Sequence, residues 1–477
     1  MRKKYVLYLA MFLALFLTAA VPLFATNYFS ADEPSYTAEE QRALLLELFD
    51  SVVSTDAPIV DLSDEWVSLE QFMKNQHSSL LTINSIINES YSRGHGGLRF
   101  PDYMGGAYLD INGNLVLLVV DSFRIMDTPS ANIALSDNVS VRFVEHSYKY
   151  LHHLFTDILE RVNYIERDGD VISYLVSFSL NEEENSLEII LDSINDENIE
   201  HFRRTISNSP ALRFTTYEEI YLRDLEWERR STEIARAEET LLGNYHSSFD
   251  YATTDSRSDT IFIYPGTTAI VGPNTPTTEP GSIAFPVTCN SVPRPNFRHC
   301  GFVTARHVLL PSANQGSRVS RVTFAPFNST RIGEVTRSVR SHDVAFVSMD
   351  RNVVPTNVLP FCRRQLTFDH APSLQNSTVI TVGATSRRNI SARVTSTSAS
   401  VTIDGARVSV ARTRFDDSSV LTRDGDSGGI VFQPIDFFDR AAWVAGIHVA
   451  INTFGFNNGY FVMSRCAVDA LNVRLGH

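Results

Sequence analysis

The segment "RDGDSGGIVF", residues 423–432, places Ser427 after an aspartate and before two glycines. Glycine adopts positive φ without strain, and Asp and Ser side chains cap nearby backbone groups, so the segment predicts a tight loop ahead of an apolar run. Such a loop suits either a plain turn or a nucleophile. A serine hydroxyl attacks at neutral pH only when a base takes its proton and a third group orients that base. The choice therefore depends on partners elsewhere in the chain.

Two other segments supply these partners. "CGFVTARHVLL", residues 300–310, is a strand-like run that leads to His307, and "SHDVAFVSM", residues 341–349, opens an apolar run with Asp343. Taken alone, each residue is compatible with a structural role at a strand end. Their order, followed by Ser427, is the order of base, orienting acid and nucleophile in one known serine triad. The combination predicts an acyl-transfer site.

With these motifs, residues 258–477 resemble a chymotrypsin-fold serine peptidase of the kind that bacteria secrete. "GSIAFPV" at 281–287 resembles the first barrel strand, "GFVTARHV" at 301–308 the histidine motif, and "GDSGG" at 425–429 the nucleophile loop. The family usually has Gly or Ala where Arg306 stands here, which puts a long cation beside the base. The resemblance implies an all-β fold of two six-stranded antiparallel barrels for this half of the chain.

The resemblance also implies a role for each residue. Ser427 is the nucleophile, His307 the general base and then acid, and Asp343 fixes the imidazole tautomer and stabilises its cation. The backbone N–H groups of Gly425 and Ser427 form the oxyanion hole, which explains a glycine at 425. We expect a serine endopeptidase with protein or peptide substrates and no cofactor. A metal site is not expected, because the cysteines and histidines lack metal-ligand spacing.

Substrate preference depends on the pocket beside the nucleophile. The family's floor position is Leu421 here, so the aspartate that selects Arg or Lys is missing. Thr422 and His448 stand where glutamyl endopeptidases have a hydroxyl and an imidazole, which hold a carboxylate by charge-assisted hydrogen bonds. Asp424 near the rim would repel an acidic substrate, and Ile451 would narrow the pocket. We expect cleavage after Glu, with a small aliphatic residue as the alternative and a purely structural His448 as the competing interpretation.

The N-terminus predicts export. Three basic residues precede an uninterrupted apolar stretch from Tyr5 to Ala25, after which the chain turns polar. This is the pattern of a signal peptide over residues 1–25, and it predicts a secreted protein. The apolar run is long enough to span a bilayer uncleaved, so the alternative is a membrane anchor with the peptidase outside the cytoplasm. A membrane partner is expected only in that case.

Charge divides the rest of the chain. Residues 26–250 have 16 Lys+Arg against 40 Asp+Glu, whereas residues 251–477 have 22 Arg, no Lys and 15 Asp+Glu. Balances of −24 and +7 favour association of the two halves, because complementary fields orient it. The alternative is that acidic surface only keeps the chain soluble. The acidic half argues against nucleic acid as a partner.

The acidic half has an α+β pattern. Residues 105–121 predict a hairpin with Asn-Gly at its turn, 147–163 a helix, 173–192 two strands, and 196–206 a second helix. This repetition predicts an α+β pro-region over residues 26–216, built as a pair of small subdomains. It resembles the pro-regions of bacterial chymotrypsin-fold proteases, which implies an intramolecular inhibitor or folding template. Slow folding of β-rich chains with non-local contacts makes such a template useful.

A connector joins the two halves. Residues 217–257 begin with a charged, helix-favouring stretch and continue as a polar stretch, where proteolytic nicking concentrates. We expect maturation between residues 244 and 262. The alternative is a mature chain that begins at Ile270, as in animal family members, whose new amine inserts beside the aspartate before the serine, here Asp426.

All four cysteines lie in the peptidase-like half, as expected for an oxidising compartment. Three pairings are possible. Cys289 and Cys300 flank a loop between two strand-like runs, so we expect them to form one disulfide and Cys362 and Cys466 the other.

The competing interpretation of the whole chain is a secreted binding protein that keeps the peptidase fold without activity, with the acidic half as a permanent recognition domain.

Overall fold

The computed structural model describes the chain from residue 67 onward with gaps. All of the described residues belong to one compact unit, residues 64–477. The described residues are 67–92, 100–120, 138–170, 172–224, 227, 229, 261–266, 268–271, 281–289, 301–309, 321–323, 331–350, 353–359, 364–386, 388–403, 405–415, 422, 424–435, 441–452 and 457–476. No helix within these segments is both long and apolar enough to cross a bilayer. The predicted signal peptide lies outside them.

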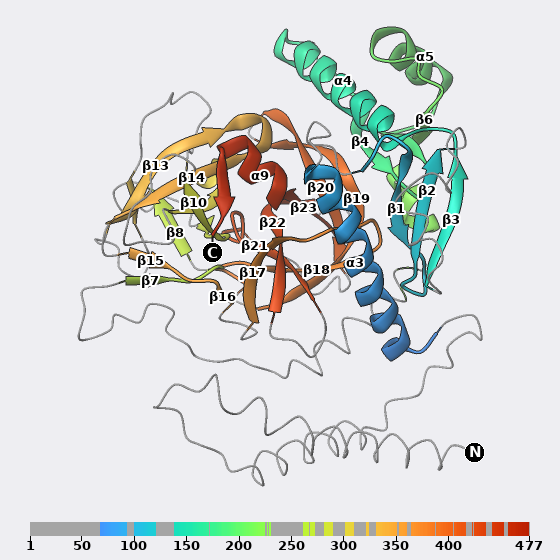
Figure 1. The fold of residues 1–477 in the computed structure, drawn as a ribbon. Coiled ribbons are helices and arrows are strands. Elements are labelled where there is room, and N and C mark those ends of the chain that lie inside the picture. Colours follow the sequence, from blue (N-terminus) through green and yellow to red (C-terminus); the bar gives the residue numbers. More distant parts are fainter. Residues whose placement is uncertain are drawn as a thin grey trace, which may run out of the picture. The chain divides into compact units, whose positions relative to one another are not determined.

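The N-terminal half contains a small sheet with two helices. The elements are α3 (Leu69–Ser92), β1 (Met104–Leu109), β2 (Leu115–Val120), β3 (Val139–Val144) and α4 (Tyr148–Arg167). β1 and β2 form the predicted hairpin, and β3 adds to β2 in parallel (Figure 1). The Asp110 carboxylate closes the turn by accepting the backbone N–H groups of Asn112 and Asn114, both at 2.9 Å. Local turn chemistry therefore sets the register of this hairpin.

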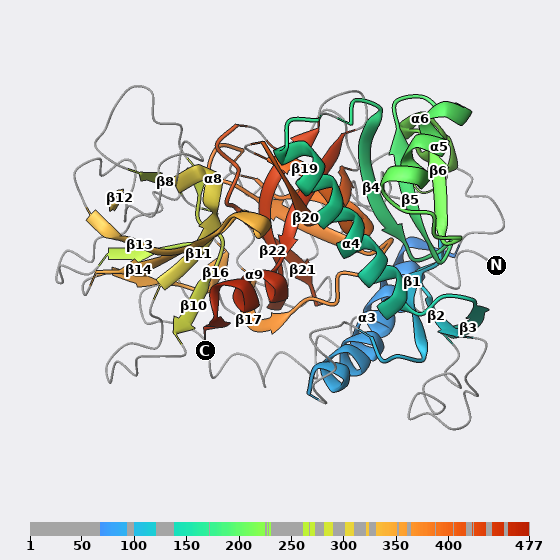
Figure 2. The same cartoon turned by 90° about the horizontal axis from the view of Figure 1, so that it is seen from above.

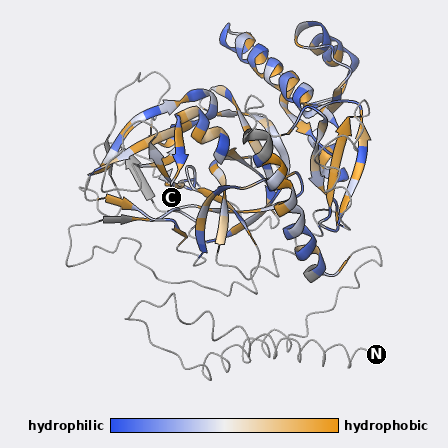
Figure 3. Cartoon of the chain, viewed as in Figure 1, coloured by the Kyte–Doolittle hydropathy of each residue, from blue (hydrophilic) through white to orange (hydrophobic). Residues whose placement is uncertain are grey.

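A second strand group follows α4. It consists of β4 (Leu175–Asn181), β5 (Ser186–Leu191), α5 (Asp196–Thr205), β6 (Leu212–Thr215) and α6 (Tyr217–Arg223). Asn195 and Thr216 cap α5 and α6, each accepting a backbone N–H with its side chain. Figure 3 shows hydrophobic residues along β1 and β2 and mostly hydrophilic residues along α5. Both predicted helices and all four predicted strands of this half are confirmed.

The C-terminal half contains a closed ring of six antiparallel strands. Its members, in order round the ring, are β18 (Thr378–Val382), β19 (Ile390–Ile403), β20 (Ala406–Phe415), β23 (Asn458–Met463), β22 (Ala441–Asn452) and β21 (Ile430–Pro434). β21 pairs again with β18, which closes the ring. β17 (Arg364–His370) pairs with β22 outside it, and β16 (Val358–Leu359) pairs with β17. Closure leaves the ring without free edges.

A second sheet consists of strands that precede the ring in the sequence, together with the last strand of the chain, β24. Its strand order is β24 (Val473–Leu475), β10 (Pro286–Cys289), β11 (Gly301–Ala305), β14 (Val344–Met349), β13 (Arg331–Val339), β12 (Arg321–Thr323), β8 (Thr268–Val271) and β9 (Gly281–Ser282). β7 (Ile261–Ile263) pairs in parallel with β15 (Val353–Pro355), and α9 (Ser464–Leu471) precedes β24. Together with the closed ring, this sheet confirms the predicted chymotrypsin-like fold class of this half.

Three apolar clusters hold the C-terminal half together. One contains only residues of the second sheet and its neighbours, such as Phe302 and Val347, and another has its buried residues only in the ring, such as Val431 and Phe461. A third joins both groups of strands, with Phe285 buried in the same cluster as residues of the ring. Burial of such surface contributes about 25 cal/mol per Å². The joint cluster therefore fixes one group of strands against the other, and the proposed site depends on residues from both.

The N-terminal half continues the sheet of the ring. β4 pairs with β19 through Ala399 and Ser179, and β5 and β6 extend the same sheet. Figure 2 shows α4 lying beside β19 and β20. A fourth apolar cluster, centred on the N-terminal half, also takes in Leu374 and Trp443 of the C-terminal half. The two halves thus share both a sheet and a core.

Candidate active site

Two of the predicted site residues meet at the junction of two strands. β11 ends at Ala305 and the short helix α8 (Arg306–Leu309) begins, which places His307 just beyond the strand. Asp343 lies between η3 (Arg340–His342) and β14. The His307 Nδ1 is 2.6 Å from Asp343 Oδ2, and the His307 backbone N–H donates to Oδ1 at 3.0 Å. The carboxylate therefore holds both the ring and the backbone of the histidine.

The backbone of Asp343 has an unusual conformation. Its φ of 50° and ψ of 42° are left-handed, a region that Asp tolerates better than most residues. The Asp343 carbonyl accepts the backbone N–H of Arg306 at 2.8 Å, and its side chain is buried. Arg306, the departure from the family motif, is itself buried, with 8% of its surface exposed. Both the backbone carbonyl and the side chain of Asp343 therefore hold the chain where β11 ends.

Ser427 lies in a loop whose glycines are required sterically. Gly425 has φ +92° and Gly428 has φ +85°, both left-handed. A Cβ at Gly428 would come within 2.2 Å of Thr304 Oγ1 and 2.4 Å of the Ser282 carbonyl oxygen. The Ser427 hydroxyl donates to the Val449 carbonyl at 3.3 Å. The loop is therefore packed directly against β11 and β9, and no larger residue fits at 428.

Ser282 connects the serine loop to the second sheet. Its backbone N–H donates to the Ser427 carbonyl at 2.8 Å, and its hydroxyl donates to the Gly425 carbonyl at 2.7 Å. Its hydroxyl also accepts the backbone N–H of Ala384 at 2.8 Å, while its own carbonyl accepts Thr304 Oγ1 at 2.6 Å. Sequence reasoning missed this residue. The only signal was its place in the predicted first barrel strand.

Asp426 is fully buried beside the serine. Its Oδ1 accepts the backbone N–H groups of Thr385 and Ser386, at 2.9 and 2.8 Å. A Cβ at Gly383 would come within 2.3 Å of the same oxygen. Two backbone amides therefore already contact the Asp426 carboxylate. In the alternative maturation, the new amine of Ile270 would insert beside this same carboxylate.

His448 lies behind the serine loop. It exchanges backbone hydrogen bonds with Gly428 and Gly429, at 2.7 and 2.9 Å, and only 3% of its surface is exposed. Burial lowers the pKa of His448 to about 4; the nearby Asp426 carboxylate opposes this shift and His307 adds to it. The imidazole is therefore neutral at neutral pH. A neutral imidazole N–H can still donate a hydrogen bond to a carboxylate.

The other predicted pocket residues differ in their surroundings. Thr422 is 2% exposed, and its Oγ1 is buried without a hydrogen-bond partner among the described residues. Ile451 is half-buried and packs against the apolar cluster of the ring, while Asp424 is exposed. Leu421 lies outside the described residues. A buried hydroxyl without a partner costs about 1–3 kcal/mol, which a substrate group that accepts its hydrogen would recover.

Each predicted disulfide has one cysteine outside the described residues. Cys300 and Cys362 belong to segments that are not described, and only the backbone of Cys289 is described. Cys466 lies on α9. Both pairings therefore stay predictions.

The two halves of the chain meet through buried polar contacts that sequence reasoning did not find. Glu182 follows β4 and is 1% exposed; its Oε1 accepts the Thr397 hydroxyl at 2.5 Å and its Oε2 accepts the Ala107 backbone N–H at 3.1 Å. Gln375 accepts the backbone N–H of Glu182 at 2.8 Å. One carboxylate thus joins both parts of the acidic half to the ring.

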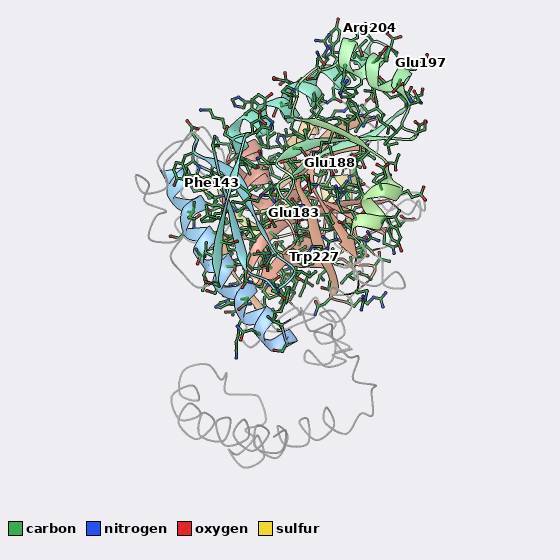
Figure 4. All side chains as sticks on the ribbon, turned by 90° about the vertical axis from the view of Figure 1, so that its right-hand side faces the viewer. Phe143, Glu183, Glu188, Glu197, Arg204 and Trp227 are labelled. Carbon is green, nitrogen blue, oxygen red and sulfur yellow. The ribbon has the colours of Figure 1, made fainter. Side chains whose placement is uncertain are left out.

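Arg407 makes the most extensive of these contacts. Its Nε donates to Glu166 Oε1 at 2.9 Å, and its two Nη atoms donate to the carbonyls of Val176 and Leu175 at 3.2 and 3.0 Å. Its backbone exchanges hydrogen bonds with the Asn163 side chain, both at 3.1 Å. The Arg393 guanidinium carbon lies 5.2 Å from the ring centroid of Trp227. Figure 4 shows that the charged residues Glu197 and Arg204 of α5 lie well away from Trp227. The ion pair of Arg407 with Glu166 therefore joins a basic group of the C-terminal half to an acidic group of the N-terminal half.

Comparisons with known proteins bear on both halves. Residues 150–216 match the model of the Pro-like C-terminal domain, and this segment spans most of α4 and all of β4, β5, α5 and β6. No curated protein matches the chain in sequence.

Among solved structures, a Nocardiopsis protease (NAPase) is 22% identical with a TM-score of 0.34, and the Thermobifida fusca protease A is 19% identical with a TM-score of 0.34. A glutamic acid specific serine protease, described as using a histidine triad in substrate binding, is 18% identical with a TM-score of 0.33. Each match covers 45% of this chain and 100% of the other.

Proposed function

We propose that this chain is the precursor of a secreted serine endopeptidase. The observation that carries the proposal is the contact of His307 Nδ1 with Asp343 Oδ2 at 2.6 Å. His307 comes directly after β11, and Ser282 hydrogen-bonds both to Thr304 of β11 and to the loop of Ser427. In a histidine held through Nδ1 in this way, Nε2 is the ring nitrogen that takes the proton of the nucleophile. Ser427 supplies a hydroxyl on a loop that steric constraints hold in one conformation. The fold and the match to the Pro-like C-terminal domain agree with this assignment.

In the proposed reaction, Ser427 Oγ attacks the substrate carbonyl and its proton passes to His307 Nε2. Asp343 keeps the proton of Nδ1 in place and stabilises the imidazolium. The backbone N–H groups of Gly425 and Ser427 stabilise the oxyanion. His307 then protonates the leaving amine, and water hydrolyses the acyl-enzyme in a second, equivalent step. The hydroxyl must first leave the Val449 carbonyl, to which it now donates, and turn to His307.

We infer cleavage after Glu from Thr422 and His448. No described residue hydrogen-bonds the buried hydroxyl of Thr422, and the buried neutral imidazole of His448 lies close to Asp426 and His307. Both groups are donors that a substrate carboxylate would accept from. A bound carboxylate would also favour the protonated imidazole, because opposite charges at close range attract strongly in a buried site. Cleavage after a small aliphatic residue is the alternative, supported by the half-buried Ile451.

We infer that the acidic half is the pro-region. It contributes β4 to the sheet of the ring, and Glu182, Glu166 and the core cluster fix it there. The domain boundaries proposed from the sequence are a signal peptide over 1–25, a pro-region over 26–216, a connector over 217–257 and a peptidase domain over 258–477. Acidic groups of one half meet arginines of the other, which supports binding in the precursor.

The test is the Ser427→Ala variant of the full chain. Loss of peptide hydrolysis with a folded protein supports the proposed nucleophile. If maturation is autocatalytic, this variant also stays uncut, whereas normal processing points to a separate activating protease. Hydrolysis that persists in the purified variant would exclude the proposed mechanism. N-terminal sequencing of the secreted wild-type protein locates the cut between residues 244 and 262 or at Ile270.

A further inference from the structure

The N–H groups of Gly425 and Ser427, the proposed oxyanion donors, make no hydrogen bond to any described residue. A donor contributes most to catalysis when its direction is fixed before the charge develops. Because a peptide unit is planar, a hydrogen bond to its carbonyl also fixes the N–H on the other side of the same bond. The Asp426 carbonyl accepts the Gly429 N–H at 2.9 Å, so the Ser427 N–H is held in this way.

The Gly425 N–H has no such support. It shares its peptide unit with the carbonyl of Asp424, to which no described residue donates. Gly425 itself has φ +92° and lacks a Cβ that would limit rotation about its own backbone bonds. The direction of its N–H therefore depends on what holds the rest of the residue.

The hydroxyl of Ser282 holds the other side of Gly425. It donates to the Gly425 carbonyl at 2.7 Å and accepts the backbone N–H of Ala384 at 2.8 Å. A hydroxyl has one proton, and the Ala384 N–H takes one of its lone pairs, so the proton is directed to Gly425. Ser282 is fully buried, so bulk solvent does not compete for this contact. It is the one hydrogen bond that a described residue makes to Gly425.

The residue that follows Gly425 is supported from the same segment. The Asp426 carboxylate accepts the backbone N–H groups of Thr385 and Ser386, which come directly after Ala384. The chain after Gly425 is therefore fixed by the Asp426 side chain. The Ser282 hydroxyl extends this fixation to Gly425.

We propose that Ser282 is a positioning residue for the oxyanion hole, whose hydroxyl holds the Gly425 carbonyl so that the N–H of the same residue points at the oxyanion. The inference rests on the proposed function, because it assigns a support to that same site. Ser282 is buried and acts through Gly425, so its effect falls on the transition state. Substrate binding in the ground state is left nearly unchanged.

The first experiment compares kcat and KM of the wild-type, Ser282→Ala and Ser377→Ala enzymes on a peptide that the wild type cleaves. Ser282→Ala should lower kcat by about 10²- to 10³-fold, the range for one lost oxyanion donor, with little change in KM. Ser377→Ala is the matched control, because that hydroxyl is also fully buried and donates to a backbone carbonyl, that of Leu374, at 2.7 Å. A loss confined to KM, or equal losses of kcat in both variants, overturns the proposal.

The second experiment uses a peptide trifluoromethyl ketone with ¹³C at its carbonyl. Ser427 Oγ forms a bond to this carbon, its proton passes to His307, and the carbonyl oxygen becomes a hemiketal oxyanion. An NMR titration of the labelled carbon gives the pKa of the hemiketal hydroxyl, which the oxyanion donors lower. In Ser282→Ala this pKa should rise, with ionisation about 10²-fold weaker, and in Ser377→Ala it should equal the wild-type value.

The outcomes separate the two levels of the account. An unchanged hemiketal pKa in Ser282→Ala overturns this inference alone, whereas a wild-type protein that forms no hemiketal overturns the proposed function with it. If Ser282→Ala does not fold, a crystal structure of the wild-type adduct decides. The Ser282 hydroxyl must contact the Gly425 carbonyl while the oxyanion accepts the Gly425 N–H, and a carbonyl turned away from Ser282 overturns the proposal.

Discussion

Asp343 contacts His307 twice, with one carboxylate oxygen at the ring nitrogen and the other at the backbone N–H. The second contact fixes the position of the histidine backbone, so the ring has little freedom except rotation about its own side-chain bonds. The carboxylate is buried, and its left-handed backbone makes the geometry dependent on the turn before β14. This pair gives the proposed base its tautomer.

Asp343→Asn should keep the fold and lower kcat by about 10⁴-fold, because an amide stabilises the wrong imidazole tautomer. The measurement is kcat on a peptide that the wild-type protein cleaves, with circular dichroism to confirm folding. Asp369→Asn on β17 is the matched control, since that aspartate is exposed. A variant at position 343 with near-normal kcat would contradict the role proposed for the pair.

Gly428→Ala should abolish activity and destabilise the protein by several kcal/mol. The added Cβ meets both a left-handed backbone and atoms of Thr304 and Ser282 at 2.2 and 2.4 Å. Gly405→Ala separates the two effects, because Gly405 has φ +68° but no atom within 4 Å of its would-be Cβ. That control should cost only about 1–2 kcal/mol. Denaturant unfolding of both variants gives the comparison, and equal losses would show that packing of the serine loop is unimportant.

Much of this loop could be predicted from the sequence, because Gly-Asp-Ser-Gly-Gly is a local pattern with local causes. The hairpin around Asp110 was predictable for the same reason. Ser282 and Glu182 were not, because their partners lie far away in the chain, for example Ala384 and Gln375, and no local pattern marks them. Charge balance predicted that the halves attract each other, but not that Arg407 would be one of the arginines that joins them.

Arg407→Met should weaken the union of the two halves by removing a buried guanidinium and leaving Glu166 and two carbonyls without their donor. Breaking a buried pair costs about 3–5 kcal/mol. We expect the separately expressed 26–250 fragment to inhibit the mature enzyme, less strongly as salt rises, and far less strongly against the Arg407→Met enzyme. Inhibition constants for both enzymes over a salt series test this. Equal inhibition of the Arg407→Met and wild-type enzymes would show that Arg407 does not contribute to binding of the fragment.

Acid should destabilise the folded protein through His448. Its pKa is about 4 when folded and near 6.5 when unfolded, so the unfolded state binds the proton first as the pH falls. Stability is therefore complete above pH 6.5 and is lost between 6.5 and 4, by about 2 kcal/mol at pH 5. Desolvation also lowers the pKa of the half-buried His370, to about 3, which acts in the same direction. Denaturant unfolding of the Ser427→Ala protein at pH 7.5 and 5 measures the loss, which His448→Gln should reduce.

The pocket assignment predicts a preference that depends on His448. With peptides that differ only in the residue before the cut, kcat/KM should be highest for Glu. His448→Ala should lower the value for Glu by about 10 to 100-fold, the range for a lost hydrogen bond to a charged group. The value for Ala or Val should change little. Preference for Ala or Val that is unaffected by the substitution would exclude the glutamyl assignment and leave the proposed triad untouched.

The central claim is that Ser427 is a nucleophile activated by His307. A fluorophosphonate reacts only with such a serine, and peptide mapping by mass spectrometry locates the adduct. We predict one adduct per processed molecule, on Ser427, and its loss in His307→Ala. A folded, processed protein that carries no adduct on Ser427 would contradict the account and favour a peptidase fold kept for binding alone.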